Sequence, residues 1–267
     1  MIENVSLYDR TKMPVIGLGL WKIDPKDLYT TIHHALKEGY THFDTATFYQ
    51  NDIPFGNIIK TSSLDRTDVF ISTKLPAHLL TYDAVKKHYS EALSHMSLDY
   101  FNLFMINAPW PWNKRGCDYA REMNEVWRAM EDLYLAEEVS AIGVSNFQIS
   151  DLENLIKQAR IVPMTNQINV YPGHVNQELL AYCKRHHITV QGYSPFKQGS
   201  LLKHPLIKSM ADLYQVTPAQ LILKFLIKLN VYPIYKTIHP SYLTENLRLD
   251  FEILQPHIEQ LIDLKDS

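Results

Sequence analysis

The sequence predicts one (β/α)8 barrel, a TIM barrel, with an N-terminal β-hairpin cap, forming a single domain over residues 1–267. Eight short strand-like runs alternate with helix-like segments along the chain, and no linker rich in glycine or serine divides it. The length of 267 residues is close to the ~250 typical of such barrels. A doubly wound α/β fold is the structural alternative, but its G-x-G-x-x-G turn is incomplete here, since the stretch from Gly17 to Lys22 lacks the third glycine.

The predicted elements follow from strand composition and helix caps. Two short β-like runs around the turn at residues 9–12 predict the hairpin, and the first barrel strand then ends at Trp21. Asp24 followed by Pro25 is typical of a helix N-terminus, and Gly39 of a helix end. The other expected strands cover residues 40–45, 69–75, 100–107, 139–146, 164–169, 189–195 and 231–237. The expected helices cover residues 25–37, 82–96, 119–135, 150–158, 176–186, 205–214, 218–229, 240–247 and 256–264.

Composition narrows the class of protein. A hydrophobic content of 46% supports a large core, and a formal charge of −3 offers no basic patch for nucleic acid or membrane. Cys117 and Cys183 lack metal-ligand spacing and are expected to be reduced thiols, and residues 1–10 do not resemble a secretion signal. We therefore expect a cytoplasmic protein that acts on small molecules. With no repeat or exposed apolar stripe in the sequence, we expect a monomer.

Polar residues stand where the predicted strands end, at the barrel rim where reacting groups collect. Asp44 and Lys74 end neighbouring strands and are expected to form an ion pair beside Tyr49. A cation near a phenol lowers its pKa and favours proton donation, which indicates an oxidoreductase. Each residue alone also has a structural explanation, such as Asp44 as a helix cap or Lys74 extending its amine to solvent. The other rim positions are Trp21, Asn107, Ser145, Asn146, Gln167, Tyr193, Ser194, Lys236 and Thr237.

The motifs in this order resemble the aldo-keto reductase family. The resemblance spans nearly the whole chain, and its long, specific motifs are GYTHFDTATFYQND and IGVSNF; the shorter ones include MPVIGLGLWKI, FISTK, INAPWP, NQINVYPG, VQGYSPF, TPAQLILKFLI and YKT. Membership implies a (β/α)8 barrel that binds NADPH or NADH in extended form and reduces the carbonyl group of aldehydes or ketones.

The resemblance also implies roles for single residues. Tyr49 would be the general acid, Lys74 would lower its pKa, and Asp44 would hold Lys74 through an ion pair. The nicotinamide would stack on Tyr193, and its carboxamide would be held by Ser145, Asn146 and Gln167, with Asp44 reaching the ribose. Ser194 and the backbone of residues 196–201 would hold the pyrophosphate, and the adenosine end would lie near Lys236, Thr237, Tyr242, Glu245 and Asn246. Trp21, Phe48, Trp110 and Trp112 would line an apolar substrate mouth, although such clusters are also common as core packing.

Two positions depart from the family pattern. Asn107 occupies the place of the fourth catalytic residue, a histidine, so that an amide can still donate a hydrogen bond but cannot become a cation. A low-turnover sensor or regulatory subunit that binds NAD(P)H is therefore the alternative function. Tyr242 replaces an arginine that pairs with the 2′-phosphate of NADPH, which weakens but does not reverse the expected preference for NADPH over NADH. A metal-dependent hydrolase is a distant third, because the histidine pairs at 33–34 and 186–187 fall on predicted helices and no metal site is expected.

Overall fold

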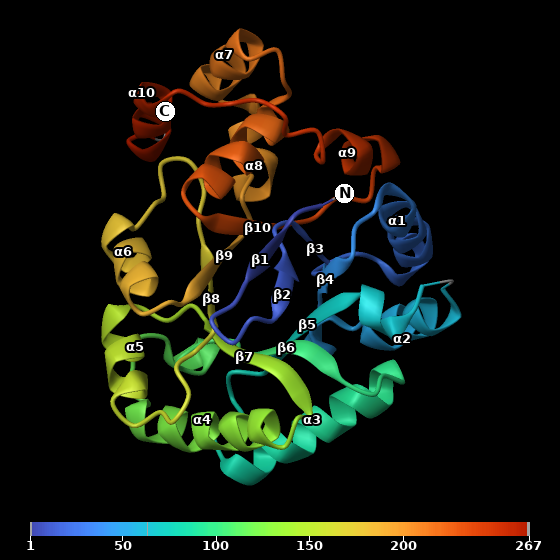
Figure 1. Cartoon of the computed structure of the whole chain (residues 1–267), viewed down its shortest axis with the longest axis vertical. Helices are drawn as coiled ribbons and strands as arrows, with labels where there is room; N and C mark the ends of the chain where they lie inside the picture. Colours follow the sequence, from blue (N-terminus) through green and yellow to red (C-terminus); the bar gives the residue numbers. More distant parts are fainter. Residues whose placement is uncertain (1, 63, 266–267) are drawn as a thin grey trace.

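The computed structural model describes residues 2–62 and 64–265. Across these residues, eight parallel strands close into a barrel in the order β10-β3-β4-β5-β6-β7-β8-β9. Helices surround the strands, as Figure 1 shows. The predicted (β/α)8 barrel is confirmed, and the doubly wound alternative is wrong, since the sheet is closed and has no open edge.

The barrel strands are short, and the helices that follow them are longer. The strands are β1 (Asn4–Ser6), β2 (Lys12–Pro14), β3 (Gly17–Gly19), β4 (His42–Asp44), β5 (Phe70–Leu75), β6 (Phe101–Ile106), β7 (Val139–Ser145), β8 (Thr165–Asn169), β9 (Thr189–Tyr193) and β10 (Val231–Tyr235). The α-helices are α1 (Pro25–Glu38), α2 (Asp52–Thr61), α3 (Tyr82–Met96), α4 (Ala120–Leu135), α5 (Ile149–Ile156), α6 (Gln177–Arg185), α7 (Pro205–Leu213), α8 (Pro218–Lys228), α9 (Pro240–Glu245) and α10 (Gln255–Ile262).

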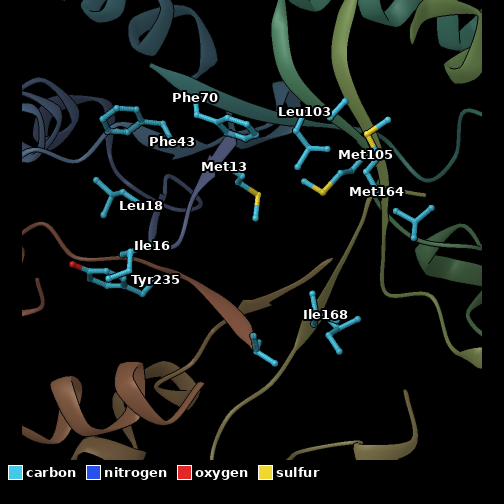
Figure 2. Packing of buried hydrophobic residues seen from close by; sticks show 14 of the residues in the cluster. Met13, Ile16, Leu18, Phe43, Phe70, Leu103, Met105, Met164, Ile168 and Tyr235 are labelled. Carbon is cyan, nitrogen blue, oxygen red and sulfur yellow. The ribbon is translucent and has the colours of Figure 1, made fainter. Parts of the chain in front are cut away.

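The N-terminal hairpin closes the amino-terminal end of the barrel. Strands β1 and β2 pair antiparallel, with Val5 opposite Met13, as the sequence predicts. The Thr11 hydroxyl donates to the carbonyl oxygen of Ser140 at 3.4 Å, near the start of β7. Met13 is fully buried and its sulfur accepts a hydrogen bond from the Gln191 amide at 3.1 Å. Met13 thus joins the hydrophobic cluster contributed by strands around the barrel (Figure 2).

Helix caps work as the sequence indicates. The Asp24 side chain accepts a hydrogen bond from the backbone of Lys26, Pro25 occupies the first turn of α1, and Gly39 ends the helix with φ of 93°. Glycine adopts that left-handed conformation without the steric penalty of a side chain. The same logic starts α8, where Thr217 and Gln220 cap each other's backbone.

Helix α2 was not predicted from the sequence. Pro54 and Gly56 interrupt its helical pattern, so local propensity argues against it. Tertiary packing outweighs propensity because Phe55 and Ile59 are buried and Gly56 brings α2 against the C-terminal end of α3. A Cβ atom at Gly56 would lie 2.1 Å from the backbone oxygen of Met96, which ends α3.

The cysteines, the helices and the groups of potential metal ligands were each considered in the sequence, and the structure describes most of these residues. Cys117 is exposed, Cys183 is buried, and both are free thiols. Among residues 2–62 and 64–265, no helix has the length and apolar character needed to cross a bilayer. In the same residues, no group of three or more His, Cys, Asp or Glu side chains is arranged to hold a metal ion. His186 caps the end of α6 instead of lying within it.

Gly56→Ala should lower the free energy of unfolding by about 1–3 kcal/mol, because the added methyl group meets backbone atoms that cannot rotate away. This loss should exceed the gain of about 1 kcal/mol that alanine brings to a helix interior. Asn57→Ala, at an exposed position of the same helix, is the matched control and should leave stability unchanged or slightly higher. Denaturant unfolding measures both variants. Equal stability of the two would show that the α2–α3 contact tolerates a methyl group.

Candidate active site

Alternation along β4 and β5 directs a set of polar side chains into the barrel. Successive strand residues face opposite sides, so His42 and Asp44 share one face of β4, and Ser72 and Lys74 share one face of β5. Asp44 lies opposite Ser72 in the parallel register. All four side chains are buried. The two strands therefore bring Asp44 and Lys74 toward the carboxyl end of the barrel, with His42 and Ser72 two residues earlier on the same faces.

Asp44 is the centre of this group. The Lys74 ammonium donates a hydrogen bond to Asp44 Oδ1 and forms a buried ion pair with it. Oδ2 accepts two further hydrogen bonds, from the Ser72 hydroxyl and from the Gln167 amide, each at 2.9 Å. A buried ion pair is tolerated when its remaining hydrogen-bonding capacity is satisfied in this way. Three strands, β4, β5 and β8, thus hold one carboxylate.

Tyr49 lies beside the ion pair, on the short 3-10 turn of residues 47–49. Lys74 Nζ donates to the Tyr49 hydroxyl oxygen at 3.3 Å. Because that oxygen accepts from the ammonium, the phenol's own proton remains available to another acceptor. The structure therefore contains the ion pair beside a phenol that the sequence predicts.

The pKa of Tyr49 differs in direction from the sequence-based expectation. Burial raises the pKa and is the largest influence, the Lys74 ammonium lowers it, and the Asp44 carboxylate raises it, with a net increase. The expected net lowering is thus wrong, because burial outweighs the Lys74 charge, although Lys74 acts in the expected direction. Burial alone would lower the pKa of Lys74, but Asp44 and Tyr49 raise it overall, so the ammonium is retained. At neutral pH the site holds a protonated phenol next to a cation.

Asn146 connects three strand ends on the far side of the site. It has left-handed backbone geometry, with φ of 63°, directly after β7. Its amide nitrogen donates to the Asn107 carbonyl oxygen at 2.8 Å and to the Ser145 hydroxyl oxygen at 3.1 Å. Its amide oxygen accepts from the Tyr193 hydroxyl at 2.7 Å. The rim residues of β6, β7 and β9 are thereby joined.

Asn107 and Gln167 are also placed by the strand register. The Asn107 backbone nitrogen donates to the Leu75 oxygen at 3.2 Å, directly beyond the pairing of β5 with β6. Asn107 is buried, at 8% exposure, and follows Met105 by two residues, so both lie on the same side of the sheet. Gln167 lies opposite Gln191 in the register of β8 with β9 and donates to it at 3.1 Å.

Three buried residues of this network were not singled out from the sequence: Gln191, the partner of Gln167, and the pair His42 and Ser72. Ser72 donates its proton to Asp44, so its oxygen must accept from His42 Nε2, which lies 3.2 Å away. This assigns the Nε2-protonated tautomer to His42. Period-two alternation from Asp44 and Lys74 is the signal that points to this pair, because each member stands two positions before one of them.

The residues expected at the adenosine end lie after β10 and on α9. Thr237 is buried and its hydroxyl accepts from the His239 backbone at 3.1 Å. Lys236 is exposed, and Nζ donates to the Lys22 carbonyl oxygen at 3.4 Å. Tyr242 is half exposed on α9, and the helix ends at Glu245 with the buried Asn246 as its C-cap.

The loop after β9 has an unusual backbone. Ser194, Lys197 and Gln198 have φ of 52°, 45° and 55°, and Gly199 has φ of 91°. Such left-handed conformations turn backbone N–H groups toward one side and can form anion-binding concavities. Several of these N–H groups bond within the loop, including that of Gly199 to the Phe196 oxygen at 2.8 Å.

Aromatic side chains follow the carboxyl ends of three barrel strands, β3, β4 and β6. Trp21, Phe48 and Trp112 are exposed by 46%, 43% and 52%. Phe48 contacts Tyr49 edge to face with 5.0 Å between ring centroids, and Trp110 contacts Trp112 in the same way at 5.1 Å. These rings are accessible at the surface and are not core packing, except for Trp110, which is partly buried.

Comparison with known proteins agrees with this geometry. The model of the Aldo/keto reductase family matches residues 15–261. The chain belongs to the aldo/keto reductase family. This oxidoreductase is 34% identical to a glyoxal reductase from Bacillus subtilis over 97% of its own length and 91% of that protein. It is 32% identical to a methylglyoxal reductase, DkgA, from Salmonella typhimurium, over 97% and 92% of the two chains.

Solved structures support the same assignment. The crystal structure of an aldo/keto reductase from Brucella melitensis has a TM-score of 0.91 to this reductase, with 33% identity, and covers 98% of this chain and 97% of that one. The structure of an aldose reductase from Schistosoma japonicum has a TM-score of 0.90 with 28% identity. The family membership and barrel predicted from the sequence are thus confirmed, whereas the roles of single residues stay predictions.

The stability of this aldo/keto reductase should depend on pH through His42. Burial lowers the pKa of His42 to about 4, below the ~6.5 of an unfolded histidine. The unfolded chain therefore binds a proton first, and the free energy of unfolding should fall by about 3 kcal/mol in total as pH drops from ~6.5 to ~4. Urea unfolding at pH 7 and pH 5 measures this slope, which His42→Gln should reduce. An unchanged slope in the variant would contradict a buried neutral His42.

Proposed function

We propose that this protein reduces aldehydes and ketones with NAD(P)H, and that Tyr49 is the general acid. One observation carries the proposal: the Lys74 ammonium, fixed by Asp44, donates to the Tyr49 hydroxyl oxygen at 3.3 Å. The two relatives described above are named as glyoxal and methylglyoxal reductases. We therefore propose small aldehydes and dicarbonyl compounds as substrates within reach of this site.

The proton path follows from the hydrogen bonds. Tyr49 remains protonated at neutral pH because its pKa is raised, so it can give its proton to the carbonyl oxygen of a substrate. The tyrosinate that remains would be stabilised by the Lys74 ammonium, whose own charge is balanced by Asp44. Ser72 and Gln167 hold Asp44 in place through hydrogen bonds to Oδ2.

The donor set of the rim fits a nicotinamide dinucleotide. When bound, the reduced nicotinamide supplies the hydride for the carbonyl carbon. Ser145, Asn146 and Gln167 carry hydroxyl and amide groups of the kind that bind a carboxamide. These groups hydrogen-bond within the rim network here and would exchange some of those partners for the carboxamide, next to the Tyr193 ring, with Asp44 toward the ribose. Ser194 and the left-handed backbone after it are suited to binding a pyrophosphate. Lys236, Thr237, Tyr242, Glu245 and Asn246 would meet the adenosine end.

The substrate side is proposed to combine one amide and several aromatic rings. Asn107 would donate a hydrogen bond to the developing oxyanion, as a neutral donor in place of the histidine in the family pattern. Trp21, Phe48, Trp110 and Trp112 would form the apolar mouth. A single domain, a monomeric state and a cytoplasmic location stay predictions from the sequence.

A low-turnover NAD(P)H-binding sensor is the second candidate, and Asn107 is the observation that favours it. Loss of an oxyanion donor typically costs ~10²-fold or more in rate. Here the donor is changed and not removed, so reduction at a lower rate is the better-supported proposal.

Tyr49→Phe tests the proposed general acid. The variant should bind NADPH as the parent does, because the aromatic ring is retained, but should lose carbonyl reduction by a factor of ~10² or more, since the hydroxyl that would supply the proton is absent. Consumption of NADPH with methylglyoxal, followed by absorbance, measures the loss. Tyr29→Phe, at an exposed site on α1, is the matched control and should keep full activity. Comparable rates for parent and Tyr49→Phe would overturn the assignment.

Asn107→His separates the two candidate functions. A histidine at this position can donate to the oxyanion and carry charge, so carbonyl reduction should become faster by about tenfold or more. Steady-state rates with methylglyoxal and benzaldehyde, with circular dichroism to check folding, provide the measurement. No gain in rate would mean that Asn107 does not act on the carbonyl as proposed.

NADPH is proposed to bind more tightly than NADH, by a modest factor, because Lys236 keeps one cation for the 2′-phosphate whereas Tyr242 brings none. Tyr242→Arg should increase this preference by about tenfold through an added charge-assisted contact. Dissociation constants for both reduced cofactors, from fluorescence titration, give the ratio. Tighter binding of NADH by the parent would reverse the ranking.

A further inference from the structure

The rim of this barrel holds a guanidinium that the proposed reaction does not use. Arg115 follows the short 3-10 turn of residues 112–114 in the loop between β6 and α4. It is exposed, and its guanidinium carbon lies 5.4 Å from the centre of the Trp110 ring. Trp110 stands three residues after Asn107 in the same loop. Arg115 is thus attached to an aromatic residue of the proposed substrate mouth.

The charge of Arg115 is not neutralised by an ion pair in the part of the chain that the structure describes. Within the described residues, no carboxylate lies within 4 Å of it, in contrast to Arg160, which contacts Glu131 and Asp132. Asp118 is the nearest acidic residue along the chain. It accepts a hydrogen bond from the backbone nitrogen of Ala120, the first residue of α4, at 2.9 Å. Stacking on an aromatic face leaves the in-plane N–H groups of a guanidinium open to a planar anion.

The charge of Arg115 also acts on Tyr193, at the end of β9. Burial raises the pKa of Tyr193, while Arg115 and then Lys74 lower it. Both cations therefore act on the same hydroxyl, which donates to Asn146 at 2.7 Å. A substrate that places its carbonyl at Tyr49 and extends toward Trp110 would carry its distal end toward Arg115.

We propose, resting on the proposed function, that Arg115 determines specificity by binding an anionic group of the substrate, so that carbonyl compounds bearing a carboxylate or a phosphate are preferred. Guanidinium groups bind both anions in a bidentate manner. The proposed 2′-phosphate contact does not compete for Arg115, because Lys236 follows β10 whereas Arg115 follows β6. The observation that carries the proposal is the seating of an unpaired guanidinium on Trp110 at the mouth.

Matched substrates test this. The ester methyl 4-formylbenzoate and the acid 4-carboxybenzaldehyde share one ring and one aldehyde but differ in charge, and 4-formylphenyl phosphate adds the second anion. The parent should show a higher kcat/KM for at least one of the two anions than for the ester. The anion with the larger ratio of kcat/KM to that of the ester is the one that the site prefers. Arg115→Gln should reduce that ratio about fivefold to tenfold, while leaving the ester nearly unchanged.

Lys114→Gln is the matched control, because it removes the same charge from the adjacent exposed position and should keep the parent's ratio. Arg115→Lys, which keeps charge but loses the planar fork, should fall between parent and Arg115→Gln. Added salt should lower the anion preference of the parent. Equal kcat/KM for ester and both anions in the parent, or an equal loss in both glutamine variants, would overturn the proposal.

A binding measurement separates this inference from the proposed function. Benzoate should quench tryptophan fluorescence of the parent more strongly than neutral benzamide at equal concentration, and Arg115→Gln should remove the difference. If this holds while the ester is not reduced, the proposed reaction fails and the anion site stands. If the ester is reduced but benzoate and benzamide behave alike, the anion site fails and the proposed reaction stands.

Discussion

The ion pair between Asp44 and Lys74 is the constraint on which the rest of the site depends. Two opposite charges are held away from water, and such pairs are stable only when their surroundings satisfy them. Asp44 meets this condition through Ser72 and Gln167, and Gln167 continues to Gln191, whose amide reaches Met13. The polar network therefore extends from the reacting rim to the hairpin at the opposite end of the barrel. Any change in strand register would leave a charge without partners.

Much of the architecture could be predicted, because it depends on local patterns. Asp44 and Lys74 could be predicted as site residues because they stand near the ends of predicted strands. Helix starts could be predicted from capping residues such as Asp24. Alternation along β5 and β9 can mark Ser72 and Gln191 as facing the same side as Lys74 and Tyr193. Their hydrogen-bond partners could not be predicted, because these lie on neighbouring strands and the register between strands is not written in local sequence. Helix α2 was missed for a related reason, since contact with Met96 outweighs the poor helix propensity of Gly56.

The direction of the Tyr49 pKa shows another limit of sequence reasoning. Charge neighbours could be listed from the motif, but the depth of burial could not, and burial is the larger influence. The position of Asn107 shows the opposite case. Its backbone is held from both sides, by the Leu75 oxygen and the Asn146 amide, so its place does not depend on which side chain it carries. The departure from the family pattern therefore changes the chemistry of one group and leaves its location intact.

The hairpin of β1 and β2 has a consequence for the order of events at the site. It covers the amino-terminal ends of the strands, with Met13 buried among residues of the barrel wall. A molecule that reaches Tyr49 would therefore approach from the carboxyl rim. If two molecules occupied this site together, the deeper one would have to enter before the other and leave after it.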